Sequence, residues 1–438
     1  MENLNDMKGY HYSVYEHRLV TANGLTYNRS FIVLKNRYGF IVRFTKYHIF
    51  SGAYEGKVYR PLASDLKMRL YYICRALNYI MIDHYIIYHV DHIFKVTKDM
   101  LTAFFMDYAL EKMENGRYRS EASIEKCVSA VTLFFYKLSC KYEGYMAVKQ
   151  SELYTNKAVY VAGGRKITKA VPDFSIRGVS EKKEIFRDIP TKVFQILLRL
   201  AVRFVPDIAF AIGLQAFAGL RPGEVCNVRQ VKGPRGAGMI FTERDGRLVR
   251  VQIDLRHEYA MRSDGVICGK IKKERIQGVY PPFLPAFQTL YEMHMGILSE
   301  RKYERDYCPM FLNHIGMAMT YKDYYNRFRK LVDEYLRPEL LQQDDPELRI
   351  YGQMLCENTL GPQSLRHWFS TQLALRGEDI AQLQFWRGDK NPLSAFGYLM
   401  NKGDLVRELS ETNDMLAGFL NWVGGQIIGN NKSIYRNP

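Results

Sequence analysis

The stretch PQSLRHWFSTQLALRGEDIAQLQFWRGDKNPLSAFGYLM, residues 362–400, predicts two helices in close succession. Gly377 suits the end of the first helix, and Gly388 suits the end of the second. Gln363 and Arg366 lie one turn apart, so they share one face of the first helix. The apolar side of the two helices is formed by Phe369, Leu373, Ile380 and Leu383. A packed helix therefore carries an amide and a guanidinium on one face.

Two stretches upstream of this one also place cations at turns. AFAGLRPGEVCNV, residues 216–228, ends one helix and starts another, which puts Arg221 at a helix terminus. There its guanidinium can form a bidentate contact with a phosphate, or it can simply pair with Glu224. GKIKKERI, residues 269–276, predicts a β-turn whose lysines approach a phosphodiester, although a solvated charged run is the plainer interpretation.

Taken together, these stretches resemble the catalytic domain of the tyrosine recombinases, the phage-integrase-like site-specific recombinases. LRHWFSTQLALRGEDIAQLQ is the most specific piece, followed by AGLRPGEV and GKIKKER. The resemblance covers roughly residues 180–405, and the helical stretch before it fits the family's core-binding domain in placement and size. It implies a mainly α fold with a small antiparallel β-sheet, an α+β arrangement in which a helical core-binding domain precedes the catalytic domain.

The resemblance also implies a set of catalytic residues. In chain order they are the first arginine Arg221, the lysine Lys270, Gln363, the second arginine Arg366, Asp389 and the nucleophile Tyr398. Lys272 and Lys273 compete with Lys270 for the lysine position. Two positions depart from the family's pattern, since Gln363 stands where His or Lys is usual and Asp389 where His or Trp is usual. Gln363 can still donate a hydrogen bond to a phosphate, but it cannot shuttle a proton at neutral pH.

Such a set implies DNA cutting and rejoining through a 3′-phosphotyrosyl intermediate, without metal or ATP. The two arginines neutralise the phosphate, Lys270 gives a proton to the leaving 5′-oxygen, and Tyr398 is the nucleophile. A carboxylate near a phosphate repels it, so Asp389 is expected to pair with Arg366 or Arg387, or to orient Tyr398. As one tyrosine among 32, Tyr398 is otherwise an ordinary packing residue.

The charge balance of the chain points to a polyanionic partner. The 438 residues include 62 Lys and Arg against 46 Asp and Glu, a formal net charge of +16, which predicts nucleic acid or an anionic membrane surface. The first residues hold no apolar signal segment, and polar residues interrupt the longest apolar candidate, Leu70–Val90. We therefore expect double-stranded DNA as the partner of a cytoplasmic, nucleoid-associated protein that contacts no membrane.

Neither a metal nor a cofactor is expected. The seven cysteines are scattered and form no CxxC pair, which argues against a disulfide framework and a cysteine-based zinc site. His89 and His92 are spaced to share a metal, but no acidic or thiol partner is evident near them in the sequence. Surface or core histidines are therefore the favoured interpretation.

Five segments are predicted along the chain. They are an N-terminal segment with a possible β-hairpin at 1–60, a helical core-binding domain at 61–150, a basic linker at 151–185, the catalytic domain at 186–405 and a tail helix at 406–438. The hairpin strands are expected at Phe31–Leu34 and Phe40–Phe44, and a second strand–turn–strand is expected around Asp245–Gly246. The tail is expected to dock in cis or on a neighbouring protomer, which would give tetramers on DNA.

Contacts with DNA are expected from basic residues outside the catalytic set. They are Lys157, Arg165, Lys166 and Lys169 in the linker, and Lys272, Lys273, Arg275 and His367 in the catalytic domain. Three other functions stay open. One is a nicking–closing enzyme of the type IB topoisomerase kind, and another is a DNA-binding regulator that kept the fold and lost the reaction, as Gln363 and Asp389 would favour. The third is a basic RNA-binding protein, for which no motif is present.

Overall fold

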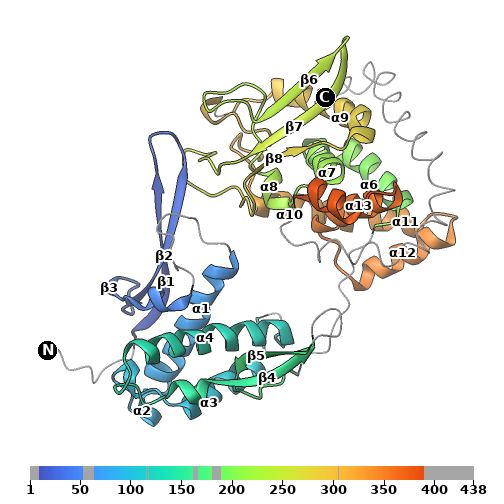
Figure 1. The fold of residues 1–438 in the computed structure, drawn as a ribbon. Helices are drawn as coiled ribbons and strands as arrows, with labels where there is room; N and C mark the ends of the chain where they lie inside the picture. Colours follow the sequence, from blue (N-terminus) through green and yellow to red (C-terminus); the bar gives the residue numbers. More distant parts are fainter. Residues whose placement is uncertain are drawn as a thin grey trace. The chain divides into compact units, whose positions relative to one another are not determined.

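The computed structural model describes residues 9–52, 64–114, 116, 118–160, 166–179, 189–303 and 305–388. The chain divides into two compact units (Figure 1). Unit 1 comprises Met1–Leu19 and Tyr27–Glu184, and unit 2 comprises Val20–Thr26 and Ile185–Pro438. The fold is mainly helical with small antiparallel sheets, as the sequence predicts. Among the described residues, no helix is both long enough and apolar enough to cross a membrane.

Unit 1 is built on a helical core. The long helices α1 and α4 pack against each other, because each carries an apolar stripe at three- and four-residue steps, such as Leu70, Ile73 and Leu77 in α1. The helical segments of this unit are α1 (Ser64–Asn78), the π-helix η2 (Tyr79–Asp83), α2 (Tyr85–Tyr88), α3 (Lys98–Leu110), α4 (Glu121–Lys141) and α5 (Gln150–Leu153), with short 3-10 turns at Tyr47–Ser51 and Ile93–Lys95.

A three-stranded antiparallel sheet precedes these helices in the chain. Its strands are β1 (His11–Val20), β2 (Thr26–Lys35) and β3 (Ile41–Phe44), in the order β1-β2-β3. Leu34 pairs with Arg43 across β2 and β3, so the expected hairpin around Asn36–Gly39 is confirmed. The sequence did not predict β1, which extends the hairpin to a sheet.

The segment expected to be a basic linker contains a regular hairpin instead. Strands β4 (Tyr154–Tyr160) and β5 (Lys166–Pro172) pair antiparallel over their whole length, from Tyr154 opposite Pro172 to Tyr160 opposite Lys166. The sequence predicted no strands within the basic linker over 151–185, and the hairpin lies inside that segment. The alternation that marks a strand is weak here, since most described side chains of both strands are exposed.

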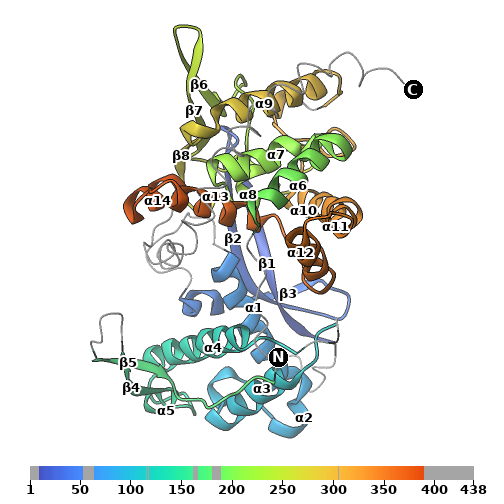
Figure 2. The same cartoon turned by 90° about the vertical axis from the view of Figure 1, so that its right-hand side faces the viewer.

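Unit 2 is organised around one fully buried helix. α7 (Pro206–Ala218) begins at a proline that suits a helix start, and all its residues from Ile208 to Ala218 are buried. α6 (Thr191–Phe204), α9 (Leu284–Ser299) and α13 (Gln363–Leu375) pack against it (Figures 1 and 2). The other helical segments are α8 (Pro222–Val225), α10 (Tyr321–Lys330), the π-helix η6 (Leu331–Leu336), α11 (Arg337–Leu341), α12 (Pro346–Glu357) and α14 (Ile380–Arg387), with 3-10 turns at Pro281–Phe283 and Arg305–Tyr307.

A three-stranded antiparallel sheet lies in the same unit. Its strands are β6 (Met239–Arg244), β7 (Arg247–Leu255) and β8 (Arg275–Gly278), in that order. The turn between β6 and β7 falls on Asp245–Gly246, as predicted, and both residues have positive φ. The lysines of GKIKKER do not sit on a tight turn, because residues 256–274 form a long irregular connection from β7 to β8.

Candidate active site

Arg221 stands at the junction of two helices. α7 ends at Gly219, whose φ of 62° is left-handed, and α8 begins at Pro222. A side chain at Gly219 would collide with the ring of Phe369 on α13, so the position needs glycine for space as well as for conformation. Arg221 caps α8, and its backbone N–H donates to Glu224 Oε2 at 3.0 Å. The glycine and proline that flank this junction therefore set the position of the Arg221 backbone, from which the guanidinium extends.

Glu224 is the buried anchor of this turn. Its carboxylate is 0% exposed and accepts from Arg221 Nη1 at 3.1 Å and from Arg275 Nη1 and Nη2 at 2.9 and 2.8 Å. Burial raises the pKa of Glu224, but the hydrogen bonds and charge of Arg275, with help from Arg221, outweigh it and bring the pKa to about 2. The carboxylate is therefore ionised and holds two cations in place.

This pairing gives Arg275 a role that the sequence did not predict. Its guanidinium is 9% exposed and is committed to Glu224, Gln277 and the carbonyl of Lys273. The expected contact of Arg275 with DNA stays a prediction. Its pairing with Glu224 is a bidentate ion pair between residues 51 positions apart, which a single sequence does not reveal.

Lys270 lies against the Arg221 turn through a backbone-to-backbone contact. A Cβ placed on Gly269 would overlap the carbonyl of Gly223, and one on Gly223 would lie 3.2 Å from the amide nitrogen of Lys270. The two main chains can approach this closely only because both residues are glycines. The contact brings the loop of Lys270 beside the turn of Arg221. Neither glycine was singled out from the sequence.

Arg366 reaches the same turn from α13. Its Nη1 donates to the carbonyl of Gly219, and its Nη2 donates to the carbonyl of Arg387 at 2.8 Å. The residue is 1% exposed, because the next residues of α13 are packed into the core, with Trp368 stacked on Phe194 at 4.0 Å. The structure thus brings the backbone of Lys270 and the guanidinium of Arg366 to the turn of Arg221, from three distant parts of the sequence.

Two hydrogen bonds attach the end of α14 to this site. Gln277 Nε2 donates to the carbonyl of Trp386 at 2.6 Å, and Arg366 donates to that of Arg387. Gly388 follows with a φ of 64°, as its predicted helix-ending role requires, and a Cβ there would collide with Arg275. Asp389 and Tyr398 lie outside the described residues.

The remaining predicted residues are placed as follows. Gln363 is exposed at the start of α13, one turn before Arg366, and His367 is half-buried. Lys272 is exposed and Lys273 is half-buried in the loop that follows Lys270. A hollow of about 670 Å³ beside this loop is lined by residues of β7, β8 and α14, among them Arg250, Lys273, Arg275, Phe385 and Gly388.

The linker lysines are only partly described. Lys157 of β4 and Lys169 of β5 are exposed and lie directly opposite each other across the hairpin. Two like charges in that position repel each other. Lys166 pairs with Tyr160 in the backbone register, and Arg165 lies outside the described residues.

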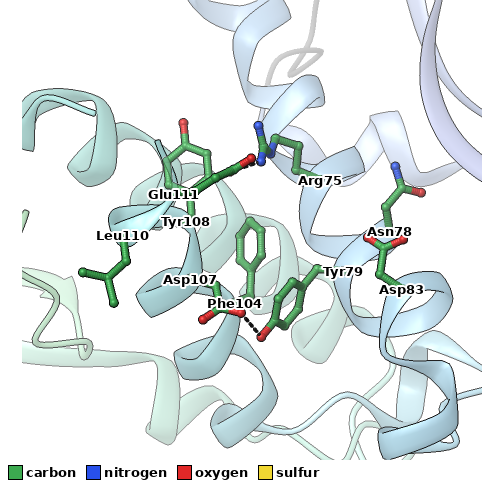
Figure 3. A pocket seen from close by; sticks show the side chains of 9 residues that line it. All are labelled: Arg75, Asn78, Tyr79, Asp83, Phe104, Asp107, Tyr108, Leu110 and Glu111. Atoms are coloured by element: carbon green, nitrogen blue, oxygen red, sulfur yellow. Dashed lines mark hydrogen bonds and ion pairs between the residues drawn. The ribbon is translucent and has the colours of Figure 1, made fainter. Parts of the chain in front are cut away.

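Unit 1 has a hollow of its own, of about 570 Å³ (Figure 3). Tyr79 Oη donates to Asp107 Oδ2 at 2.7 Å, and Arg75 pairs with Glu111. Its aromatic wall includes Phe104. No group of three or more His, Cys, Asp or Glu residues is placed to hold a metal ion anywhere in the described part of the chain.

Several solved structures are similar to this chain. The XerH site-specific recombinase bound to difH substrate has 12% identity and a TM-score of 0.47, covering 76% of this chain and 76% of that chain. The Tn1549 transposon integrase in complex with circular intermediate DNA has 18% identity and a TM-score of 0.45, covering 81% and 94%. A lambda integrase dimer bound to a COC′ core site has 12% identity and a TM-score of 0.44, covering 81% and 93%.

No protein-family model matches the chain, and no curated protein matches it. The TM-scores of the three structures are all below 0.5, so these likenesses carry no weight for the activity. What the chain does has to be inferred from its own residues.

Proposed function

We propose that this chain is a tyrosine-type DNA strand transferase, a site-specific recombinase of the tyrosine recombinase family acting on double-stranded DNA. The observation that carries the proposal is the convergence of Arg221, Lys270 and Arg366 at one turn. The anchored end of α14 supports it, since Tyr398 follows Gly388 by ten residues. Ten extended residues span at most about 35 Å, which allows the tyrosine to serve this site or that of a neighbouring protomer.

The proposed reaction needs no ATP, because the phosphotyrosyl bond conserves the energy of the phosphodiester bond that is broken. Tyr398 releases its phenol proton to water as its oxygen attacks the phosphorus, an O–P bond to the 3′ phosphate forms, and the bond to the 5′-oxygen breaks. Arg221 and Arg366 neutralise the charge on the non-bridging oxygens, and Lys270 gives its proton to the leaving oxygen. A second 5′-hydroxyl reverses the step, and this joins a new strand.

The two departures from the family's pattern have assigned roles in this proposal. Gln363, exposed one turn before Arg366, donates a hydrogen bond to a non-bridging oxygen. Asp389 directly follows the anchored Gly388 in the sequence, and we assign it to a pair with Arg366 or Arg387, or to orienting Tyr398. Lys157 and Lys169, which face each other on β4 and β5, supply phosphate contacts.

A nicked suicide substrate made from the DNA that flanks the gene tests the enzyme. We expect the unaltered protein to form a covalent adduct that survives denaturant, and Tyr398→Phe to form none. Tyr335→Phe is the matched control, because Tyr335 stacks on Phe204 at 4.3 Å and phenylalanine keeps that contact. An unaltered protein without an adduct, or an adduct in Tyr398→Phe, contradicts the proposal.

One observation favours a second candidate, a DNA-binding regulator with the same fold and no reaction. Arg366 is buried, and two of its nitrogens donate to backbone carbonyls. A guanidinium used in this way supports the fold whether or not a phosphate is bound. Specific DNA binding without any covalent adduct from intact or nicked sites would establish this candidate.

A further inference from the structure

We propose that Glu258 is a positioning residue for Lys270, and that the turn Val20–Thr26 holds the backbone of Glu258 in place. This inference rests on the proposed function, because it takes Lys270 to be the acid that protonates the leaving 5′-oxygen. It assigns a part in the site to a carboxylate and to an N-terminal turn that lie outside the predicted set of site residues.

The first step is the contact between Glu258 and the loop of Lys270. Glu258 Oε1 accepts a hydrogen bond from the backbone N–H of Ile271 at 2.5 Å. Lys270 also interacts electrostatically with this carboxylate, and lowers its pKa against the larger, raising effect of burial. The half-buried carboxylate therefore binds the peptide group that follows Lys270. This peptide group belongs to the irregular connection between β7 and β8, which contains neither a helix nor a named strand.

Two features then hold the loop. Gly223 packs against the backbone of Gly269 and Lys270, and Glu258 binds the next amide along the chain. Without the carboxylate, the loop keeps the close approach of Gly223 at Lys270 and the hydrogen bond from Arg275 Nη1 to the carbonyl of Lys273 at 2.9 Å, but the amide of Ile271 between them loses its acceptor. The direction of the Lys270 side chain depends on both, because the backbone dihedrals of Lys270 lie between the two attachments.

Glu258 is itself held by the turn Val20–Thr26, which belongs to unit 2. The backbone N–H of Thr26 donates to the carbonyl of Glu258 at 3.2 Å, and Thr26 Oγ1 donates to the same oxygen at 3.3 Å. Ala260 N–H returns a bond to the carbonyl of Gly24 at 3.0 Å, and Leu25 bridges to Tyr259. This is a short antiparallel pairing, so the turn acts as an extra strand on the segment of Glu258.

Gly24 fits this turn closely. Its φ is +74°, and a Cβ would collide with the guanidinium of Arg235. Arg235 lies 5.8 Å from the ring of Tyr259 and donates to the carbonyl of Ala260. A Cβ at Gly24 would therefore be strained by this φ and would displace the guanidinium of Arg235 from the carbonyl of Ala260, beside the segment that carries Glu258.

A pair of suicide substrates separates positioning of the acid from a general defect. One has the natural 5′-oxygen at the scissile phosphate, and the other has a 5′-bridging sulfur, whose thiolate leaves without protonation because thiols have a pKa of ~8.5. We expect Glu258→Ala to cleave the oxygen substrate about tenfold more slowly, part of the 10²–10⁴-fold that general acid catalysis supplies. On the sulfur substrate it should match the unaltered protein, as should Lys270→Ala.

Two matched controls sharpen the test. Glu258→Gln keeps an oxygen that accepts from Ile271 but loses the charge that interacts with Lys270, so it should cleave the oxygen substrate faster than Glu258→Ala. Gly24→Ala should show the sulfur-rescued defect, whereas Gly39→Ala should not, since Gly39 also has a positive φ but no atom within 4 Å of an added Cβ. Hydrogen exchange at 269–273 should speed up in Glu258→Ala and stay slow in Glu258→Gln.

The outcomes separate this inference from the proposed function. If the unaltered protein forms no adduct with either substrate, the proposed function fails and the role of Glu258 fails with it. If the unaltered protein forms adducts and Glu258→Ala cleaves the oxygen substrate equally fast, the inference alone is wrong. Equal slowing of Glu258→Ala on both substrates would also overturn it, because that pattern marks a distorted fold.

Discussion

A single buried carboxylate organises the cations of this site. Glu224 joins Arg221, three residues away, to Arg275 on the neighbouring strand β8, and it does so without exposure to solvent. A buried ion pair of this kind adds little net stability compared with apolar residues, but it fixes geometry. Removing one partner leaves a buried charge uncompensated, which is costly.

The pKa of Glu224 predicts a pH dependence of stability. The value falls from an ordinary 4.5 to about 2 on folding, so the ion pair contributes stability above pH 4.5 that is lost as the pH drops toward 2. The shift corresponds to about 3 kcal/mol. Urea unfolding at successive pH values should show Glu224→Gln already destabilised at pH 7 and losing about 3 kcal/mol less than the unaltered protein on acidification. Parallel curves for the two proteins would contradict this.

Residue-level features were predicted where the signal is local. Gly388 ends a helix and the pair Asp245–Gly246 forms a turn as expected, because glycine readily adopts a positive φ and aspartate tolerates one. The partner of Arg275 is not local, so its pairing with Glu224 could not be predicted. Glycine pairs such as Gly223 and Gly269 matter only through a contact that the fold creates.

At the scale of elements, the contact of α8 with the loop before β8 is the tightest feature of the site. Gly269→Ala should force the loop of Lys270 away from the turn of Arg221, destabilise the fold by about 1–3 kcal/mol and slow formation of the covalent adduct. Gly296→Ala is the control, because it lies within α9 with no atom within 4 Å of an added Cβ.

The control should be neutral or stabilising by up to about 1 kcal/mol, since alanine favours a helix over glycine. Thermal unfolding and single-turnover cleavage measure the two effects. An unchanged rate in Gly269→Ala would mean that the glycine contact does not set the position of Lys270.

The hairpin of β4 and β5 carries the second element-scale prediction. Lys157 and Lys169 repel each other across the strands, so their joint replacement by alanine should not lower stability. If both contact phosphates, the slope of log affinity against log salt should become shallower by about 2. Lys46 and Lys126, two exposed lysines of unit 1 outside the hairpin, provide the matched double variant. Equal slopes for the two double variants would exclude the hairpin as a special contact.

The hairpin of β4 and β5 was not predicted from the sequence. Its described side chains are mostly exposed on both strands, so no buried face imposes the alternation that identifies a strand. Buried elements were predicted better, since the apolar stripes of α1 and α4 follow directly from their spacing. The candidate catalytic set was implied by the family resemblance, but only the fold shows that the loop of Lys270 and the guanidinium of Arg366 meet the turn of Arg221.

For the whole molecule, the charge of +16 and the proposed chemistry lead us to expect that the protein assembles on DNA. A duplex site with two binding halves should carry two protomers, and two such sites should join as a tetramer. Light scattering should therefore find tetramers with specific DNA and smaller species without it. Only monomers on DNA after cross-linking would contradict a recombinase and favour a nicking–closing enzyme.

The covalent bond between Tyr398 and DNA tests the account most directly. The adduct from a suicide substrate would be digested with protease and nuclease, and the modified peptide would be sequenced by mass spectrometry. The account predicts a nucleotide attached through a 3′ phosphate to Tyr398 and to no other tyrosine. Attachment at another residue, or no attachment in a protein that binds the same DNA specifically, would contradict it.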